Sequence, residues 1–151
     1  MTINIKGYQV LIDDEDYEKV NKYKWRISSK NRGIYFETGR IWKGEKRIYL
    51  HKILINCPHE LLSDHIDGNT LNCQKNNLRI ATLSQNSMNR KNKNKLKYKG
   101  ISFDKRNRKW EAQICISRKK LYLGRYKTPE EAYKVYCKAA KKYFGEFARF
   151  E

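Results

Sequence analysis

The sequence predicts an α+β protein with a small N-terminal β-rich unit, a ββα segment, and a three-stranded antiparallel sheet packed on one helix. Three observations support this fold class. Residues 101–123 alternate apolar and polar side chains, which is typical of strands with one buried face. Residues 128–145 carry a helical apolar stripe. Residues 63–90 follow the order strand, loop, strand, helix.

The N-terminal fifty residues predict mostly short strands. Stretches 8–12 and 34–38 are rich in β-branched and aromatic residues, so each is expected to be a strand, with a short helix at 14–23 between them. A third strand at 46–50 is expected to lead into an apolar stretch that contains His51. None of these segments indicates a chemistry.

The stretch 63–90 holds the most informative pattern. A short strand is expected to end at Asp64 and His65, and a loop rich in Gly and Asn leads to a second strand, LRIAT. Thr82 and Gln85 have the spacing of a capping box, which predicts a helix from Leu83 with Asn86 in its first turns.

The last third predicts a sheet with two different faces. After three alternating strands, Thr128 is a good helix N-cap, Pro129 suits the first helical position, and Glu131 completes a capping box. The helix is expected to end at Gly145 and to cover the apolar sheet face. The opposite face is expected to stay open, with Ser102, Gln113, Lys120 and Tyr122 on it.

The charge indicates a polyanionic partner, most often a nucleic acid, and DNA is the expected one for the open sheet face. The chain has 34 Lys and Arg against 16 Asp and Glu, a net charge of +18. Residues 1–90 carry 15 basic and 10 acidic side chains, and residues 91–151 carry 19 and 6, so the C-terminal part is the stronger candidate for backbone binding. With 11 Tyr, 5 Phe and 3 Trp, the chain is not a disordered basic tail.

The predicted domains are 1–90, with the ββα core at about 50–90, then a basic linker at 91–97 and a second domain at 98–151. The sequence shows no signal peptide and no membrane span, and its four cysteines form no C-x-x-C pair, so a cytoplasmic location is expected. A zinc site made by Cys57, His59 and Cys73 is a less favoured alternative, because zinc ligands usually come in closer pairs.

Residues 63–90 resemble the ββα-metal core of HNH nucleases. The matching positions are Asp64-His65 at a strand end, Asn77 in the loop and Asn86 on the helix, within the pattern D-G-N…N-N-L-R…T…S-Q-N of phage and intron-encoded members. The resemblance covers about forty residues. It implies a metal-dependent DNA endonuclease, with homing as the role.

The resemblance assigns a role to each of these residues. Asp64 and Asn86 would supply oxygen ligands to one Mg²⁺ or Mn²⁺, a donor set that suits a hard cation. His65 would deprotonate the attacking water, for which an ordinary pKa near about 6.5 is suitable. Asn77 would brace the loop and orient the histidine.

Other polar residues near this pattern have open assignments. Asp67 could assist the metal, although a turn role before Gly68 is favoured. His51, in YLHKILI, could approach the scissile phosphate or be a packed or surface histidine. Arg79 is a candidate for a phosphate contact.

Residues 98–145 resemble the AP2/ERF DNA-binding domain. The shared marks are Y-K-G-I, K-W-x-A-x-I, L-Y-L-G and the T-x-E-E-A helix start. Ser102 and Cys115 depart from the plant members, which usually have arginine there, so a different target sequence is expected. Trp110 is expected in the core. The implied DNA contacts are Lys99, Arg106, Gln113, Lys120 and Tyr122, with Arg108 and Arg118 on phosphates.

Together these features predict a phage- or mobile-element-type HNH endonuclease that acts in a bacterial host cell. One active site per chain predicts a nick in one strand, and a double-strand break would need a dimer or a second visit to the DNA. A monomer is expected, with a dimer as the alternative. A catalytically inactive DNA-binding regulator is the main alternative, and a structural RNA-binding protein is a third. The regulator is less favoured because Asp64, His65, Asn77 and Asn86 are all present.

Overall fold

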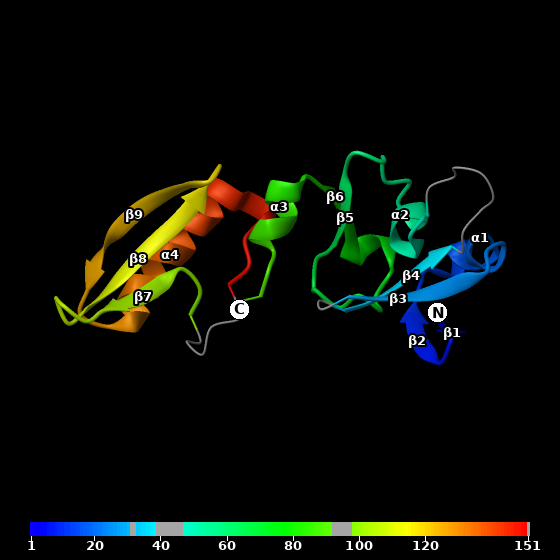
Figure 1. Cartoon of the computed structure of the whole chain (residues 1–151), viewed down its shortest axis with the longest axis horizontal. Coiled ribbons are helices and arrows are strands. Elements are labelled where there is room, and N and C mark those ends of the chain that lie inside the picture. Colours follow the sequence, from blue (N-terminus) through cyan, green and yellow to red (C-terminus); the bar gives the residue numbers. More distant parts are fainter. Residues whose placement is uncertain (31–32, 39–46, 92–97, 151) are drawn as a thin grey trace. The chain divides into compact units, whose positions relative to one another are not determined.

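A computed structural model describes residues 1–30, 33–38, 47–91 and 98–150. The chain divides into two compact units, Met1–Asn86 and Ser87–Glu151. Of the predicted linker at 91–97, residues 92–97 lie outside the described residues. The described part is a mixture of four α-helices and four small antiparallel sheets, in agreement with an α+β class (Figure 1).

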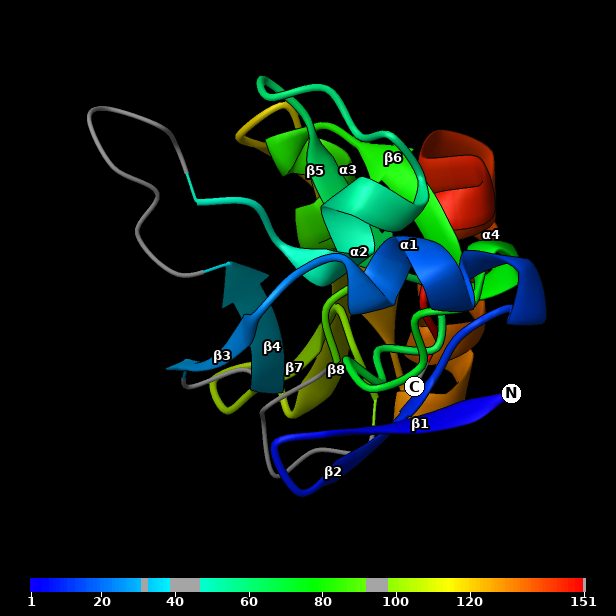
Figure 2. The same cartoon turned by 90° about the vertical axis from the view of Figure 1, so that its right-hand side faces the viewer.

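The N-terminal unit contains three two-stranded sheets joined by short helices. The first hairpin turns at Lys6 and Gly7, both at positive φ, which suits the twist of a two-residue turn. Helix α2 lies against β4 and β5 (Figure 2). The paired strands are β1 (Thr2–Ile5) with β2 (Tyr8–Leu11), β3 (Trp25–Lys30) with β4 (Gly33–Thr38), and β5 (Leu62–His65) with β6 (Leu78–Ala81). The helices are α1 (Tyr17–Asn21), α2 (Leu50–Leu54) and the start of α3 (Leu83–Met88), whose last two residues belong to the second unit.

The strand predicted at 46–50 is wrong. Lys46 lies outside the described residues, and Tyr49 forms only an isolated bridge with Glu37. Leu50 begins helix α2, because Leu50 and Leu54 lie one helical turn apart and both are buried in the core. The expected helix at 14–23 is shorter, with a 3₁₀ turn at Asp14–Asp16 before α1.

The core of this unit is continuous across its sheets. Its loop at 71–73 is fixed to the end of β2, because the Leu11 N–H donates to the Leu71 carbonyl at 2.9 Å and the Cys73 N–H donates to the Leu11 carbonyl at 2.8 Å. Cys73 therefore belongs to the core. The buried members are Ile5, Val10, Ile12, Val20, Trp25, Phe36, Leu50, Leu54, Cys73 and Leu78.

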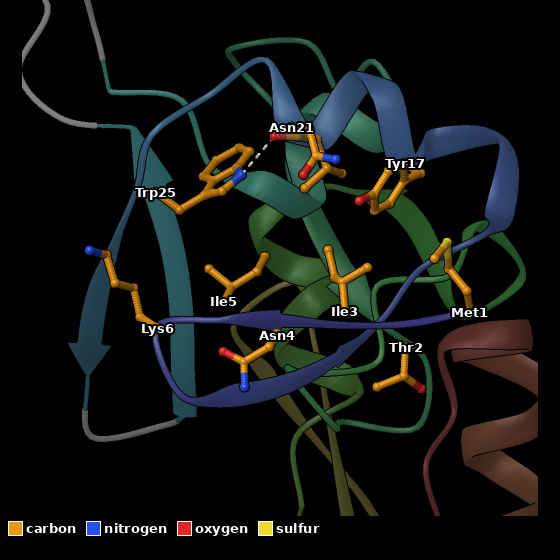
Figure 3. A pocket seen from close by; sticks show the side chains of 10 residues that line it. Met1, Thr2, Ile3, Asn4, Ile5, Lys6, Tyr17, Asn21 and Trp25 are labelled. Carbon is orange, nitrogen blue, oxygen red and sulfur yellow. Dashed lines mark hydrogen bonds between the residues drawn. The ribbon is translucent and has the colours of Figure 1, made fainter.

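A cavity of about 430 Å³ opens between β1 and α1 (Figure 3). Ile3 and Ile5 point into it from β1, and the Trp25 indole donates to the Val20 carbonyl at its edge, at 2.9 Å. None of the residues that the sequence assigns to a site lines this cavity. The lining residues are Met1 to Lys6, Tyr17, Val20, Asn21 and Trp25.

The C-terminal unit is a three-stranded antiparallel sheet with one helix across it. Strands β7 (Ile101–Asp104), β8 (Lys109–Ile116) and β9 (Lys119–Tyr126) lie in this order, and α4 (Pro129–Phe144) packs against all three (Figure 1). The capping box of Thr128 and Glu131 is formed. Helix α4 ends before Gly145, whose φ is 53°.

The helix covers the apolar sheet face, as the alternation predicts. Ile101, Ala112 and Ile114 are buried against α4, and Trp110 packs at the edge of this core. Described residues before the predicted start at 98 also belong to this unit, because Met88 packs on the same core. A β-bulge at Ala112/Gln113 shifts the register with β9.

Candidate active site

The end of β5 carries two buried polar residues. Asp64 is 5% exposed and His65 is 6% exposed. The register pairs Asp64 with Arg79 and His65 with Leu78 on β6. Neighbouring residues of a strand point to opposite faces, so Asp64 and His65 serve different sides of this small sheet.

Asp64 forms an ion pair with Arg79. The Arg79 Nε donates to Asp64 Oδ2 at 2.9 Å, and a terminal guanidinium nitrogen lies 2.9 Å from the same oxygen. The side chains are 5% and 11% exposed, so the pair sits away from water, where an uncompensated charge would be costly. The guanidinium for which the sequence suggests a phosphate contact thus contacts the expected metal ligand, and its contact with a phosphate stays a prediction.

His65 lies in a cluster of aromatic rings and a thiol. Its Nε2 is 3.8 Å from Cys73 Sγ, and its ring centre is 5.3 Å from that of His51 and 6.4 Å from that of Tyr35. Burial lowers the pKa of His65, and the nearby Asp67 and Asp64 carboxylates only partly oppose this shift. The imidazole is therefore neutral at neutral pH, with a lone pair on one nitrogen.

His51 belongs to the same cluster. The sequence alone did not decide whether His51 approaches the phosphate or is packed, and in the structure it is buried on α2. Its ring centre lies 5.6 Å from that of Tyr49, in a stacked arrangement, and 5.5 Å from that of Tyr35, edge-on. The four rings of Tyr35, Tyr49, His51 and His65 come from three separate segments. Their meeting point is not visible in any local motif.

Asn77 braces the loop that follows His65. Its side-chain carbonyl accepts from the Asp67 N–H at 3.0 Å, while its amide donates to Asp67 Oδ1 at 3.0 Å and to the Asn72 carbonyl at 2.8 Å. Burial alone would raise the pKa of Asp67, but hydrogen bonds from Asn69, Asn72 and Asn77 lower it overall. Asp67 is an exposed turn residue in this arrangement.

Asn86 lies on α3, which follows β6 after a single residue. The predicted capping box is formed, since the Gln85 N–H donates to Thr82 Oγ1 at 3.3 Å and the Thr82 N–H donates to Gln85 Oε1 at 2.8 Å. The Asn86 N–H closes the first helical turn on the Thr82 carbonyl at 3.0 Å, and the residue is half-buried.

Among the described residues, no group of three or more His, Cys, Asp or Glu side chains could hold a metal ion. Cys57, His59 and Cys73 are all described, so they do not form the zinc group considered above. The metal ligands predicted from the sequence, Asp64 and Asn86, are of another kind, one carboxylate and one amide, and they stay a prediction.

The open face of the C-terminal sheet and its turns carry the expected DNA contacts other than Lys99. Gln113 pairs across the strands with Tyr122, and Lys120 pairs with Cys115. Two arginines stand in the turns at positive φ, Arg108 before β8 and Arg118 before β9. The exposed members of the predicted set are Arg106, Arg108, Arg118, Lys120 and Tyr122.

Lys99 is placed differently from the other expected contacts. Its ammonium donates to the carbonyls of Met88 at 2.6 Å and Arg90 at 3.0 Å. Burial lowers its pKa, and Arg149 and Arg90 add to that effect. Lys99 thus holds the end of the α3 segment, and its contact with DNA stays a prediction.

Arg125 was not among the residues predicted from the sequence. This exposed arginine donates to Glu111 at 2.7 Å and lies 3.4 Å from Asp104, so it balances two carboxylates on the open sheet face. The signal was present in the pairing of Glu111 with Arg125 across β8 and β9, but it depends on the register beyond the β-bulge.

Comparisons with known proteins give matches to both parts of the chain. The sequence model of the AP2 domain family matches residues 96–146. Over 144 residues the chain is 30% identical to an uncharacterized HNH endonuclease of Acanthamoeba polyphaga mimivirus, covering 95% of this chain and 74% of that protein. This chain belongs to the HNH endonuclease family.

A second relative of this chain comes from a bacteriophage. Protein 3.8 of Escherichia phage T7 is 34% identical over 89 residues, which are 58% of this chain and 73% of that protein. No solved structure gives a significant match. In the described part of the chain, each helix is too short or too polar to cross a membrane.

Proposed function

We propose that this protein is a metal-dependent endonuclease that hydrolyses one strand of duplex DNA at a site made by Asp64, His65, Asn77 and Asn86. The observation that carries the proposal is the buried Asp64-His65 end of β5, with a neutral imidazole and a loop braced by Asn77. The family membership supports the same reaction class.

His65 is the general base of the proposed reaction. A base must hold a lone pair at neutral pH, and the lowered pKa of His65 provides this. The imidazole takes a proton from the attacking water, whose oxygen then bonds to phosphorus while the bond from phosphorus to the 3′ oxygen breaks. Asn77 keeps the adjoining loop in place through Asp67.

Asp64 and Asn86 have the donor chemistry for Mg²⁺ or Mn²⁺. One anionic and one neutral oxygen suit a hard cation that keeps several waters, and neither sulfur nor imidazole is in the set. Such an ion would stabilise the negative charge that develops on the phosphate and the leaving oxygen. Arg79 neutralises the buried Asp64 carboxylate through its ion pair.

The C-terminal unit holds the duplex. Its exposed arginines and Lys120 lie on the open sheet face and in its turns. They can therefore contact phosphates and base edges with the unit in its folded form. A monomer with one site would nick one strand, and homing is the role that this domain combination supports. The expected setting is the cytoplasm of a bacterial host cell.

The second candidate is an inactive DNA-binding regulator. One observation favours it: the Arg79 guanidinium already occupies Asp64 Oδ2, which competes with a metal ion for that oxygen. The two candidates differ in one respect, since only the endonuclease cleaves.

The test is a nicking assay on a supercoiled plasmid pool with random inserts, with and without Mg²⁺ or Mn²⁺. We expect metal-dependent nicks from the wild type and a loss of at least about 100-fold in His65→Asn. His59→Asn, at an exposed histidine, is the matched control and should keep full activity. If the wild type binds DNA tightly but cuts nothing with either metal, the regulator is correct.

A further inference from the structure

Cys73 has a fixed place beside His65. It is 1% exposed, it is a member of the N-terminal core, and its backbone N–H donates to the Leu11 carbonyl at 2.8 Å. Its Sγ lies 3.8 Å from His65 Nε2, within the distance of a hydrogen bond to sulfur. A core this well anchored holds the sulfur at one position relative to the imidazole.

The Cys73 thiol has one proton, and this proton is donated to a second neighbour, the Thr70 carbonyl. Cys73 Sγ lies 3.7 Å from the Thr70 carbonyl oxygen, and a carbonyl can only accept. Burial raises the pKa of the Cys73 thiol to about 12, so the proton stays on sulfur at any working pH. The thiol therefore donates to Thr70, and only its lone pairs are left for the imidazole.

From this geometry we propose that Cys73 is a positioning residue that accepts a hydrogen bond from His65 Nε2–H and thereby leaves the imidazole lone pair on Nδ1. The partner of one imidazole nitrogen decides which nitrogen carries the proton. In the reaction proposed above, on which the catalytic part of this inference rests, Nδ1 is then the atom that takes the proton from water.

This assignment is consistent with both forms of His65 during turnover. A neutral imidazole in this tautomer donates through Nε2, and an imidazolium does the same, because both have a hydrogen there. The contact to Cys73 therefore persists when Nδ1 gains the proton. His51 and Tyr35 pack on the His65 ring and oppose a flip that would exchange the two nitrogens.

Two substitutions separate the acceptor role from simple packing. Cys73→Ser keeps one donor hydrogen and a lone pair, so it should still donate to Thr70 and accept from His65. Cys73→Val fills the apolar site but has no acceptor. A packing role predicts that Val is the better replacement in this core, whereas the positioning role predicts that Ser is better. Cys57→Val, at a cysteine with its own contact to the Pro58 carbonyl, is the matched control.

The direct readout is the tautomer of His65 in metal-free protein. With ¹⁵N-labelled histidine at pH 8, long-range ¹⁵N–¹H correlations distinguish a protonated Nε2 from a protonated Nδ1. His65→Asn identifies the His65 signals by their loss. We expect a protonated Nε2 in the wild type, Cys73→Ser and Cys57→Val, and a mixture of tautomers in Cys73→Val.

A His65 with its proton on Nδ1 in the wild type would overturn the inference, and this measurement requires no variant to fold. An unchanged tautomer in a folded Cys73→Val would overturn it as well. In the nicking assay, we expect Cys73→Val to lower kcat about tenfold at unchanged KM, with Cys73→Ser close to wild type. If the tautomers are as expected but the wild type does not nick DNA, the proposed function fails and the positioning of His65 stands.

Discussion

Replacing Asn77 by Ala should loosen the loop that follows His65. The change removes the three hydrogen bonds that tie Asn77 to Asp67 and Asn72. Bonds between neutral groups contribute about 1 kcal/mol each, and the bond to the Asp67 carboxylate about 1.5 to 3 kcal/mol. Because Asp67 is exposed, water replaces part of what is lost, so we expect the free energy of unfolding to fall by about 2 to 3 kcal/mol.

The assay is urea unfolding followed by the NMR signal of the Trp25 indole N–H, which reports on the N-terminal unit because it donates to the buried Val20 carbonyl. Asn4→Ala is the matched control. It removes one exposed turn bond to the Gly7 N–H and should lower the free energy of unfolding by less than about 1 kcal/mol. Equal losses in the free energy of unfolding in the two variants would show that the Asn77 hydrogen bonds do not stabilise the loop after His65.

The other predictions concern the C-terminal unit and the thiols. Thr128→Ala breaks the capping box of α4 and should lower the free energy of unfolding of this unit by about 1 kcal/mol. Unfolding is followed through Trp110 fluorescence in a protein whose other tryptophans are replaced by Phe. An unchanged free energy would mean that the cap contributes nothing. Lys99→Met should lower the melting temperature of this unit, because it removes the bond to the Met88 carbonyl. Lys120→Ala should weaken DNA binding and its salt dependence at unchanged stability. If Lys99→Met weakens DNA binding at an unchanged melting temperature, Lys99 is a DNA contact. With iodoacetamide, Cys115 should react first and Cys73 last, as judged by peptide mass spectrometry, because Cys115 is exposed and burial raises the pKa of Cys73 to about 12; early labelling of Cys73 would contradict its burial.

Local signals predicted the elements that depend on neighbouring residues. The capping boxes at Thr82 and Thr128 placed the starts of α3 and α4, because each box joins residues only three apart. The alternation in 101–123 predicted the C-terminal sheet and its buried face, since strand periodicity is written in consecutive residues.

The sequence was less informative where distant segments decide the structure. Residues 46–50 have the composition of a strand, but Leu50 begins helix α2, because Leu50 and Leu54 pack on the core one helical turn apart. Arg79 became an ion-pair partner of Asp64 through the β5–β6 register. The environment of His65 depends on Cys73 and His51, which come from different segments, so the direction of its pKa shift could be found only from the fold.

The most direct test of the account is whether Asp64 and Asn86 hold one divalent ion together. Substoichiometric Mn²⁺, added to ¹⁵N-labelled protein, broadens NMR signals close to the bound ion. We expect the backbone signals of Asp64 and His65 and the side-chain amide of Asn86 to broaden first. Asp64→Ala should abolish this effect, and Asp14→Ala, at an exposed carboxylate, should leave it intact. Broadening that spares these three residues, or that persists in Asp64→Ala, would contradict the account.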